Sequence, residues 1–200
     1  MISALRRLPN RLAIIIALGA AATVLVPVSS AQADLINLSA CNLSPLSQPF
    51  TPWLDPSWYE LAPGGDFESD SWQLTGGAQQ VPGSESFDAT GTQGDSSLSL
   101  PAGASAQSPA TCVDAAYPTI RMFTKGTGLV AVSVVYGDLT IPAGVAVSLG
   151  NGWQASLPAL TESALVALTE DGSAQVSIKL TTVLGNVRVD DVFVDPWNRS

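Results

Sequence analysis

Residues 175–182 (QVSIKLTT) alternate between apolar and polar side chains, and this pattern constrains the fold more than any other feature of the chain. Val176, Ile178 and Leu180 fall on one side of an extended segment, and the residues between them are polar. A period of two residues is typical of a β-strand with one buried face. Other short apolar runs alternate with clusters of Gly, Ser, Asn and Asp, and no stretch of a dozen residues has helical periodicity. The sequence therefore predicts an all-β sandwich.

Glycine-containing clusters divide the chain into candidate strands. A hairpin is predicted at Gly126-Thr127-Gly128, between the apolar runs 119–125 and 129–136. Turns are also predicted at residues 150–152 (GNG) and at Gly185-Asn186. In the run 129–136, Val130, Val132 and Val134 are expected on one buried face. The other predicted strands are residues 66–74, 97–100, 145–149, 175–182 and 187–194.

Residues 1–33 have the three parts of a secretory signal peptide. Three arginines supply positive charge, residues 12–28 are almost entirely apolar, and Ala31 and Ala33 fit an A-x-A cleavage site. A single membrane anchor is the alternative, since the apolar run approaches the roughly 20 residues that span a bilayer. Pro27 and the small residues after it favour cleavage. We expect a secreted protein, or one held in the cell envelope, without a stable membrane span after cleavage.

The charge of the chain after cleavage limits its partners. All 17 acidic residues lie after Ala33, whereas three of the eight basic ones are removed with the signal peptide, which leaves a net charge of −12. Such a chain is repelled by nucleic acid, so nucleic-acid binding is not expected. The chain has no histidine, which removes the usual general base of Ser-His-Asp and Cys-His catalysis and the commonest zinc ligand.

Two cysteines, Cys41 and Cys112, are both in the exported part of the chain. An even number of cysteines in an exported protein predicts a disulfide between them. Residues 34–64 form a separate segment that is rich in proline and aromatic residues, and spaced prolines exclude both a continuous helix and a central strand. We therefore expect an extended segment that is tethered at Cys41 and lies over a β-sandwich domain of residues 65–200.

Three motifs resemble those of the carbohydrate-binding jelly rolls attached to xylanases and laminarinases. Residues 65–68 (GDFE), followed by Trp72, are similar to the opening strand of those modules, and residues 94–100 (GDSSLSL) are similar to their second strand. Residues 189–192 (VDDV) are similar to their closing strand. The resemblance spans residues 65–196 and implies a galactose-binding-like jelly roll of a secreted bacterial protein.

The resemblance also implies a structural calcium ion, because in that family calcium commonly lies where the first and last strands pair. Carried over by position, Glu68 and Asp190 are its side-chain ligands, with Asp191 as a substitute and backbone oxygens of residues 91–95 completing the site. Adjacent aspartates point to opposite faces of a strand, so only one of the two would enter the site. The alternative is that these carboxylates are solvated charges at strand ends.

A polysaccharide or a cell-surface glycan is the ligand that the resemblance implies. Sugars are held by aromatic rings that stack on them, and the best candidates are Trp72, which matches the family tryptophan, and Trp153, which follows a predicted turn. Aromatic residues of a β-sandwich are more often part of the core. The proline-rich segment could also fill the groove in which the family's ligand lies.

Three functions are therefore compared. The first is a secreted, non-catalytic module that binds carbohydrate, and the second is an extracellular or cell-envelope structural or interaction protein without a small ligand. The third is a glycoside hydrolase, which needs two carboxylates flanking the scissile bond. None of the glutamates follows a strand pattern that would bring two carboxylates to a common cleft, so no catalytic residue is predicted. The five glutamates are Glu60, Glu68, Glu85, Glu162 and Glu170.

Overall fold

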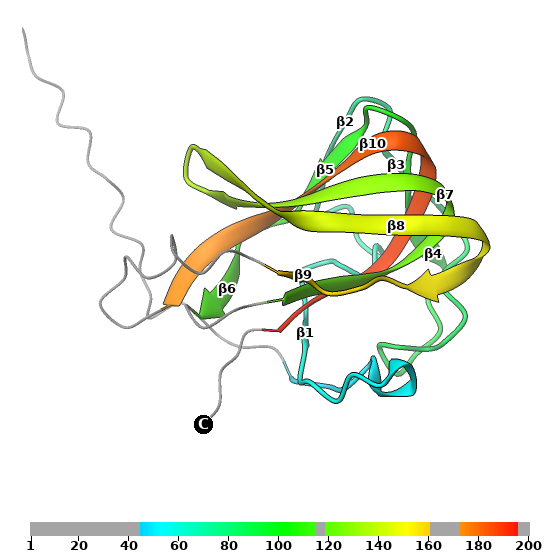
Figure 1. Ribbon diagram of the computed structural model, residues 1–200, viewed down its shortest axis with the longest axis horizontal. Coiled ribbons are helices and arrows are strands. Elements are labelled where there is room, and N and C mark those ends of the chain that lie inside the picture. Colours follow the sequence, from blue (N-terminus) through cyan, green and yellow to red (C-terminus); the bar gives the residue numbers. More distant parts are fainter. Residues whose placement is uncertain (1–44, 115–118, 161–172, 196–200) are drawn as a thin grey trace, which may run out of the picture. The chain divides into compact units, whose positions relative to one another are not determined.

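The computed structural model describes residues 45–114, 119–160 and 173–195, and regular structure in these residues is almost entirely β-strand (Figure 1). The one-turn 3-10 helix η2 (Thr51–Trp53) is the exception within this part of the chain. The all-β prediction is confirmed. The strands are β1 (Glu60–Leu61), β2 (Gln73–Thr75), β3 (Gln79–Pro82), β4 (Ser96–Leu100), β5 (Ser105–Gln107), β6 (Thr111–Asp114), β7 (Thr119–Tyr136), β8 (Leu139–Ala155), β9 (Ala159–Leu160) and β10 (Ser173–Val194).

Strand β10 is the centre of the sheet. It pairs along one side with β7 and along the other with the short strands β1, β4, β5 and β6, all in antiparallel register. Strand β7 continues the sheet to β8 and β9. In Figure 1, β7 and β8 run side by side as two long ribbons. Among the described strands β8 pairs only with β7, so it forms one edge of the sheet.

The hairpin and turn predictions at three glycine clusters are wrong. Strand β7 passes through Gly126-Thr127-Gly128 without a break, β8 passes through residues 150–152, and β10 passes through Gly185-Asn186. Each cluster lies within a long strand instead of between two short ones. The chain reverses instead after Tyr136, between β7 and β8.

These glycines lie next to one another in three adjacent strands, and we call them the glycine row. Gly126 pairs with Gly150, and Gly128 pairs with Gly185. A Cβ atom on Gly128 would lie only 2.1 Å from the backbone oxygen of Leu184. The backbones approach too closely for a side chain here, and the register of β7 with β8 and β10 shifts beside these residues. Figure 1 shows that all three long strands bend along their length. Glycine therefore permits a bend of paired strands at this point, not a chain reversal.

The first predicted strand, residues 66–74, is also mostly wrong. Only its last residues belong to β2, because residues 62–67 turn twice, with the Gly65 N–H bonded to the Ala62 oxygen at 2.7 Å and the Phe67 N–H bonded to the Gly64 oxygen at 3.1 Å. The first strand is β1, a few residues earlier, and it pairs with the end of β10. The first and last strands of the described chain thus lie side by side.

The main core lies on one face of β10 and β7. It includes Val130, Val132 and Val134 of β7 and the alternating apolar residues of β10 that begin at Val176, so the predicted alternation of both runs is confirmed. Ile120 and Met122, which precede the glycine row in β7, belong to the same core. The bend therefore lets both ends of one strand contribute to a single apolar cluster.

Residues 45–61 pack against the opposite face of the sheet. Phe50 and Tyr59 are fully buried and form an aromatic cluster with Phe123 of β7 and Phe193 of β10. The rings of Phe50 and Phe123 are stacked, with centroids 5.3 Å apart. Within the described residues, no helix is long and apolar enough to cross a membrane. Cys41 and the side chain of Cys112 lie outside the described residues, so the predicted disulfide stays a prediction.

Candidate functional site

The face of β10, β7 and β8 that points away from the main core, here called the outer face, has three zones. At one end Phe123 and Phe193 are covered by the aromatic residues of the 45–61 segment. In the middle lie Arg188 of β10, Lys125 of β7 and Trp153 of β8, and register places Arg188 opposite Lys125. Beyond the glycine row the outer face carries Leu184, Leu129 and Val147, followed by Thr181 and Lys179 of β10. Because strand residues alternate between faces, the register fixes these neighbours.

The middle zone is a cation–aromatic cluster of Trp153, Lys125 and Arg188. The Trp153 ring is partly exposed, with Lys125 Nζ 5.8 Å from its centroid and Arg188 Cζ 5.6 Å from it. A cation within about 6 Å of an indole ring is attracted by the negative charge of the ring face. The two cations therefore hold the indole in place on the sheet.

Hydrogen bonds hold the Arg188 side chain rigidly, but they do not neutralise its charge. Its Nε donates to the Ser97 hydroxyl at 3.1 Å, and its Nη2 donates to the Pro82 carbonyl at 2.8 Å and to the Gly83 carbonyl. Among the described residues neither Arg188 nor Lys125 forms an ion pair with a carboxylate; the pair found there is Arg121 with Asp55. Two cations without a carboxylate partner are unexpected in a chain with 17 acidic residues.

Two further aromatic residues extend the surface at this end of the sheet. Phe87, which is 43% exposed, and the partly buried Trp53 have ring centroids 4.9 Å apart. Both contact Phe123, at 5.4 Å between centroids, and Trp153 packs against the same cluster. The aromatic surface is therefore assembled from three distant parts of the chain around one buried ring.

The structure separates the two tryptophans that the sequence singled out. Trp153 lies in strand β8 rather than after a turn, and it is partly exposed on the outer face. Trp72 is only 7% exposed and belongs to the main core, where its ring packs on Phe67 with centroids 5.1 Å apart. Its indole N–H donates to the Pro63 oxygen at 3.0 Å. We therefore build the candidate site on Trp153 and leave Trp72 out of it.

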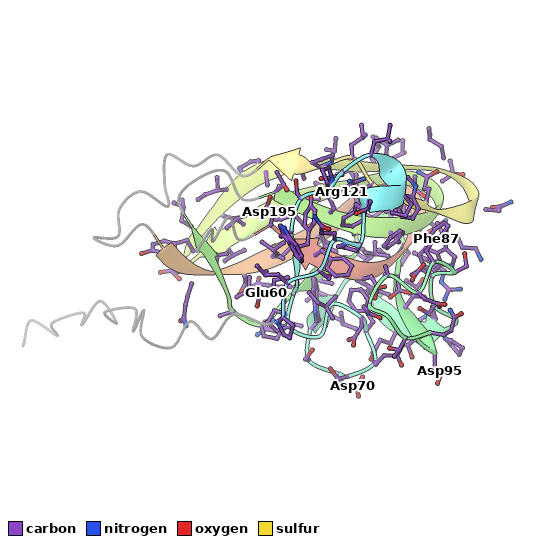
Figure 2. All side chains as sticks on the ribbon, turned by 90° about the horizontal axis from the view of Figure 1, so that it is seen from below. Glu60, Asp70, Phe87, Asp95, Arg121 and Asp195 are labelled. Carbon is purple, nitrogen blue, oxygen red and sulfur yellow. The ribbon has the colours of Figure 1, made fainter. Side chains whose placement is uncertain are left out.

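Glu68 lies apart from this cluster, beside an open hollow of about 410 Å³ that it lines together with Asp70 and Gln80. The Glu68 Oε1 atom accepts hydrogen bonds from the N–H groups of Asp95 and Ser96, both at 2.8 Å. A much smaller hollow of about 70 Å³ reaches the edge of Trp72. Figure 2 places Asp70 on one side of the ribbon and Arg121 on the other. Pro82, which also lines the hollow, accepts a hydrogen bond from Arg188 of the cation–aromatic cluster.

Asp190 and Asp191 are buried in β10. The Oδ2 atom of Asp190 accepts hydrogen bonds from the Ser84 hydroxyl at 2.7 Å and from the Glu85 N–H at 2.6 Å, and its Oδ1 accepts one from the Asp191 N–H at 3.0 Å. Ser84 and Glu68 both border the position that a Cβ on Gly94 would occupy. Ser84 therefore binds Asp190 and lies near Glu68 on the other side of Gly94.

Burial is the main cause of the raised pKa values of Asp190 and Asp191. It raises the pKa of Asp190 to about 7, although three hydrogen-bond donors oppose the change. Burial, together with the charges of Asp190, Glu85 and Asp66, raises the pKa of Asp191 to about 8. Among the described residues no group of three or more Asp, Glu, Cys or His side chains is arranged to hold a metal ion. Calcium therefore stays a prediction, and any site would depend on backbone oxygens.

Sequence reasoning did not identify Lys125, Arg188 or Phe87. The two cations lie 63 residues apart in the chain and meet only because β7 and β10 pair in this register. Phe87 lies in the loop of residues 83–94, which the sequence marks only as polar. A local pattern does not reveal such a cluster, because it depends on strand pairing.

No known protein-family model matches the sequence, and no curated protein matches it. Solved structures with similar folds include the C-terminal CBM6 module of the laminarinase LamC from Zobellia galactanivorans, with 9% identity and a TM-score of 0.46 over 66% of this chain and 95% of that one. The CBM22-1 and GH10 modules of Clostridium thermocellum xylanase 10B match with 14% identity and a TM-score of 0.46, over 66% of this chain and 27% of that one. A CBM61 module in complex with β-1,4-galactotriose matches with 16% identity and a TM-score of 0.39, over 66% and 94%. Sequence identities and TM-scores this low indicate a similarity of fold and nothing about function.

Proposed function

We propose that this protein is an exported, non-catalytic module that binds carbohydrate across the outer face at Trp153. The observation that carries the proposal is the cation–aromatic cluster, in which a partly exposed indole is held on an open sheet face by Lys125 and Arg188. An aromatic ring offers an apolar face to the C–H groups of a pyranose, and nearby donors bind its hydroxyl groups. The residues 1–33, read as a signal peptide, support export.

The cluster is held rigidly, which favours binding. Trp153, Lys125 and Arg188 each lie on a different strand of one sheet, and the Arg188 side chain is tied to Ser97 and Pro82. Sites on strands are positioned more precisely than sites on loops, so little conformational entropy is lost on binding. Phe87 and Trp53 continue the aromatic surface, which suits an oligosaccharide better than a single sugar.

The proposal assigns no catalytic role to the buried carboxylates near the outer face. Glu85, Asp190 and Asp191 are buried, at 2%, 0% and 4% exposure, and are closed to a polymer. Glu85 is further occupied by hydrogen bonds from the N–H groups of Phe87 and Ala89. Among the described carboxylates, Glu68 and Asp70 line an open hollow, which makes this hollow the place to test for glycoside hydrolysis. The same polysaccharides should be assayed for release of reducing ends.

The test is retention of the exported, processed protein on a panel of neutral and acidic polysaccharides. We expect saturable binding to at least one polymer and loss of that binding in Trp153→Ala. Trp58→Ala is the matched control, because Trp58 is 54% exposed in the 45–61 segment and is not part of the cluster. Trp58→Ala should bind as the unmodified protein does. Thermal unfolding of both variants checks that they fold.

Three outcomes would contradict the proposal. The absence of binding to every polymer would rule out carbohydrate as the ligand of this surface. Binding that survives in Trp153→Ala but is lost in Asp70→Asn would move the site to the hollow beside Glu68. Release of reducing ends that is abolished by Glu68→Gln would make the protein a hydrolase.

A further inference from the structure

The cation–aromatic cluster lies in a part of the sheet that contains almost no acidic residues. Strands β3, β4, β7 and β8 have no Asp or Glu. Strand β10 has two, Asp190 and Asp191, and both are buried, at 0% and 4% exposure. The charged groups that these strands bring to the Trp153 ring are Lys125 and Arg188, and both are positive.

Further carboxylates lie in the loop of residues 83–94 and around the hollow beside Glu68. Glu85 is buried and accepts hydrogen bonds from two N–H groups of its own loop. Glu68 likewise accepts two backbone N–H groups. Within the described part of the chain, neither carboxylate forms an ion pair with Lys125 or Arg188. The charge of the two cations is therefore not neutralised by these residues.

The placement of the two cations is unfavourable for the protein alone. Register puts Lys125 directly opposite Arg188, and like charges directly opposite each other on paired strands repel. Hydrogen bonds to Ser97 and Pro82 fix the Arg188 guanidinium, so it cannot turn away. An anion bound beside both cations would relieve this repulsion.

Both cations also keep hydrogen-bond donors for a ligand. Within the described residues, neither Nη1 of Arg188 nor Nζ of Lys125 donates a hydrogen bond. Both side chains are partly exposed. Gly83, which is exposed and has no side chain, leaves the guanidinium uncovered, since a Cβ there would lie 3.4 Å from Nη2 and 3.8 Å from Nη1 of Arg188.

We propose that the ligand of the outer face is an acidic glycan, and that Lys125 and Arg188 bind the carboxylate or sulfate group of a sugar stacked on Trp153. This inference rests on the proposed function, because it concerns the same site. Hydrogen bonds from a cation to an anionic oxygen are about twice as strong as those between neutral groups. The two cations therefore favour an acidic sugar over a neutral one.

Neutral sugars should flank the acidic one. The aromatic surface continues from Trp153 to Phe87 and Trp53, and the cation at that end, Arg121, is already paired with Asp55. The chain after the signal peptide has a net charge of −12 and repels a polymer that is charged at every sugar. Physiological salt screens charges more than about 8 Å apart, so an isolated acidic group interacts mainly with the cations beside it. A glycan with acidic sugars at intervals fits both facts.

Lys125→Gln is the variant that tests the proposal. Its removal of one charge ends the repulsion with Arg188, so the variant should be at least as stable as the unmodified protein. It should weaken binding of the acidic glycan at least about 10-fold, because it removes a hydrogen bond between charged groups. Lys125→Arg keeps the charge and should restore most of the affinity. Lys179→Gln is the matched control, since Lys179 is also partly exposed but pairs with Ser133, beyond the glycine row.

The experiment compares each acidic glycan with a neutral form of the same polymer. Hyaluronan, xanthan, gum arabic and glucuronoxylan carry uronic acids at intervals, and each is used before and after reduction of its carboxyl groups to alcohols. Carrageenan and its desulfated form test sulfate as the acidic group. We expect at least one acidic glycan to bind at least about 10-fold more tightly than its neutral form. This preference should shrink at high salt and in Lys125→Gln, and it should persist in Lys179→Gln.

The outcomes separate this inference from the proposed function. Binding that depends on Trp153 but is equal for an acidic glycan and its neutral form overturns the inference and leaves the proposed function standing. Equal losses in Lys125→Gln and Lys179→Gln also overturn it, because the affinity would then follow the net charge of the chain. If neither acidic nor neutral glycans bind, both proposals are wrong.

Discussion

Arg121 of β7 donates a hydrogen bond through Nη1 to the Asp55 carboxylate at 2.6 Å, and this ion pair joins the 45–61 segment to the sheet. The Arg121 guanidinium also donates from Nε and Nη2 to the Ser156 oxygen, at 3.0 and 2.7 Å, and lies 4.1 Å above the centre of the Phe50 ring. Burial alone would raise the pKa of Asp55, but hydrogen bonds from Tyr59, Ser57 and Arg121 hold it below its usual value. Arg121 thus anchors the 45–61 segment to the sheet by an ion pair, by hydrogen bonds and by its contact with the Phe50 ring.

Asp55→Asn should lower the free energy of unfolding by about 2 kcal/mol. The substitution leaves the buried Arg121 charge without a carboxylate, and removing one partner of a fully buried pair costs roughly 3–5 kcal/mol. We expect less than that here because Asp55 is 17% exposed and water can partly replace it. Urea unfolding measures the change. Asp138→Asn, at an exposed position between β7 and β8, should change stability little, and equal stability of the two variants would contradict the role of the pair.

Gly128→Ala should be strongly destabilising, although it adds only one methyl group. That group would lie 2.1 Å from the backbone oxygen of Leu184, so the paired strands β7 and β10 would have to move apart. Overpacking of this kind costs about 1–3 kcal/mol. Gly152→Ala in β8 is the control, because a Cβ there meets nothing within 4 Å. If both variants unfold at the same temperature, the glycine row does not determine the close approach.

Strands in which apolar and polar side chains alternate were predicted from the sequence. The bends within the long strands β7, β8 and β10 were not. Val176 and Val130 were placed correctly in the core because side-chain alternation is a local property. Glycine is ambiguous, since the same residue permits a chain reversal or a close approach of two strands. Which of these occurs at Gly126 depends on Gly150 opposite it, and pairing between distant strands is not encoded locally. For the same reason, the sequence did not reveal that Lys125 lies opposite Arg188.

In calcium-free buffer the protein should become less stable as pH rises from about 4 to about 8. The pKa of Asp190 is raised to about 7 and that of Asp191 to about 8, from an ordinary value of 3.8. Between pH 4 and pH 8 the unfolded chain has released protons that these two carboxyl groups keep in the folded chain. The free energy of unfolding therefore falls by up to about 1.4 kcal/mol per pH unit for each carboxyl group. The stabilisation that the protonated Asp190 and Asp191 provide is fully present below pH 4 and is lost above pH 8.

Asp191→Asn isolates the source of this dependence. Asparagine cannot ionise, but its amide can still donate a hydrogen bond to Glu85, with which Asp191 interacts. The variant should therefore show a smaller decline in stability between pH 5 and pH 8. Asp138→Asn should keep the full decline. An unchanged slope in Asp191→Asn would show that this carboxyl group does not titrate as its burial implies.

The calcium site predicted from the sequence should make calcium oppose the loss of stability at high pH. A bound dication favours ionised carboxylates, and a ligand at 100 times its Kd stabilises the folded state by about 2.7 kcal/mol. At pH 8 we expect calcium to raise the unfolding temperature and magnesium to raise it less. Glu68→Gln should weaken the response, because it removes a charge while an oxygen can still accept the N–H groups of Asp95 and Ser96. If calcium leaves the unfolding temperature at pH 8 unchanged, the predicted site at Glu68 and Asp190 is absent, because a cation that neutralised these carboxylates would have to stabilise the form in which they are ionised.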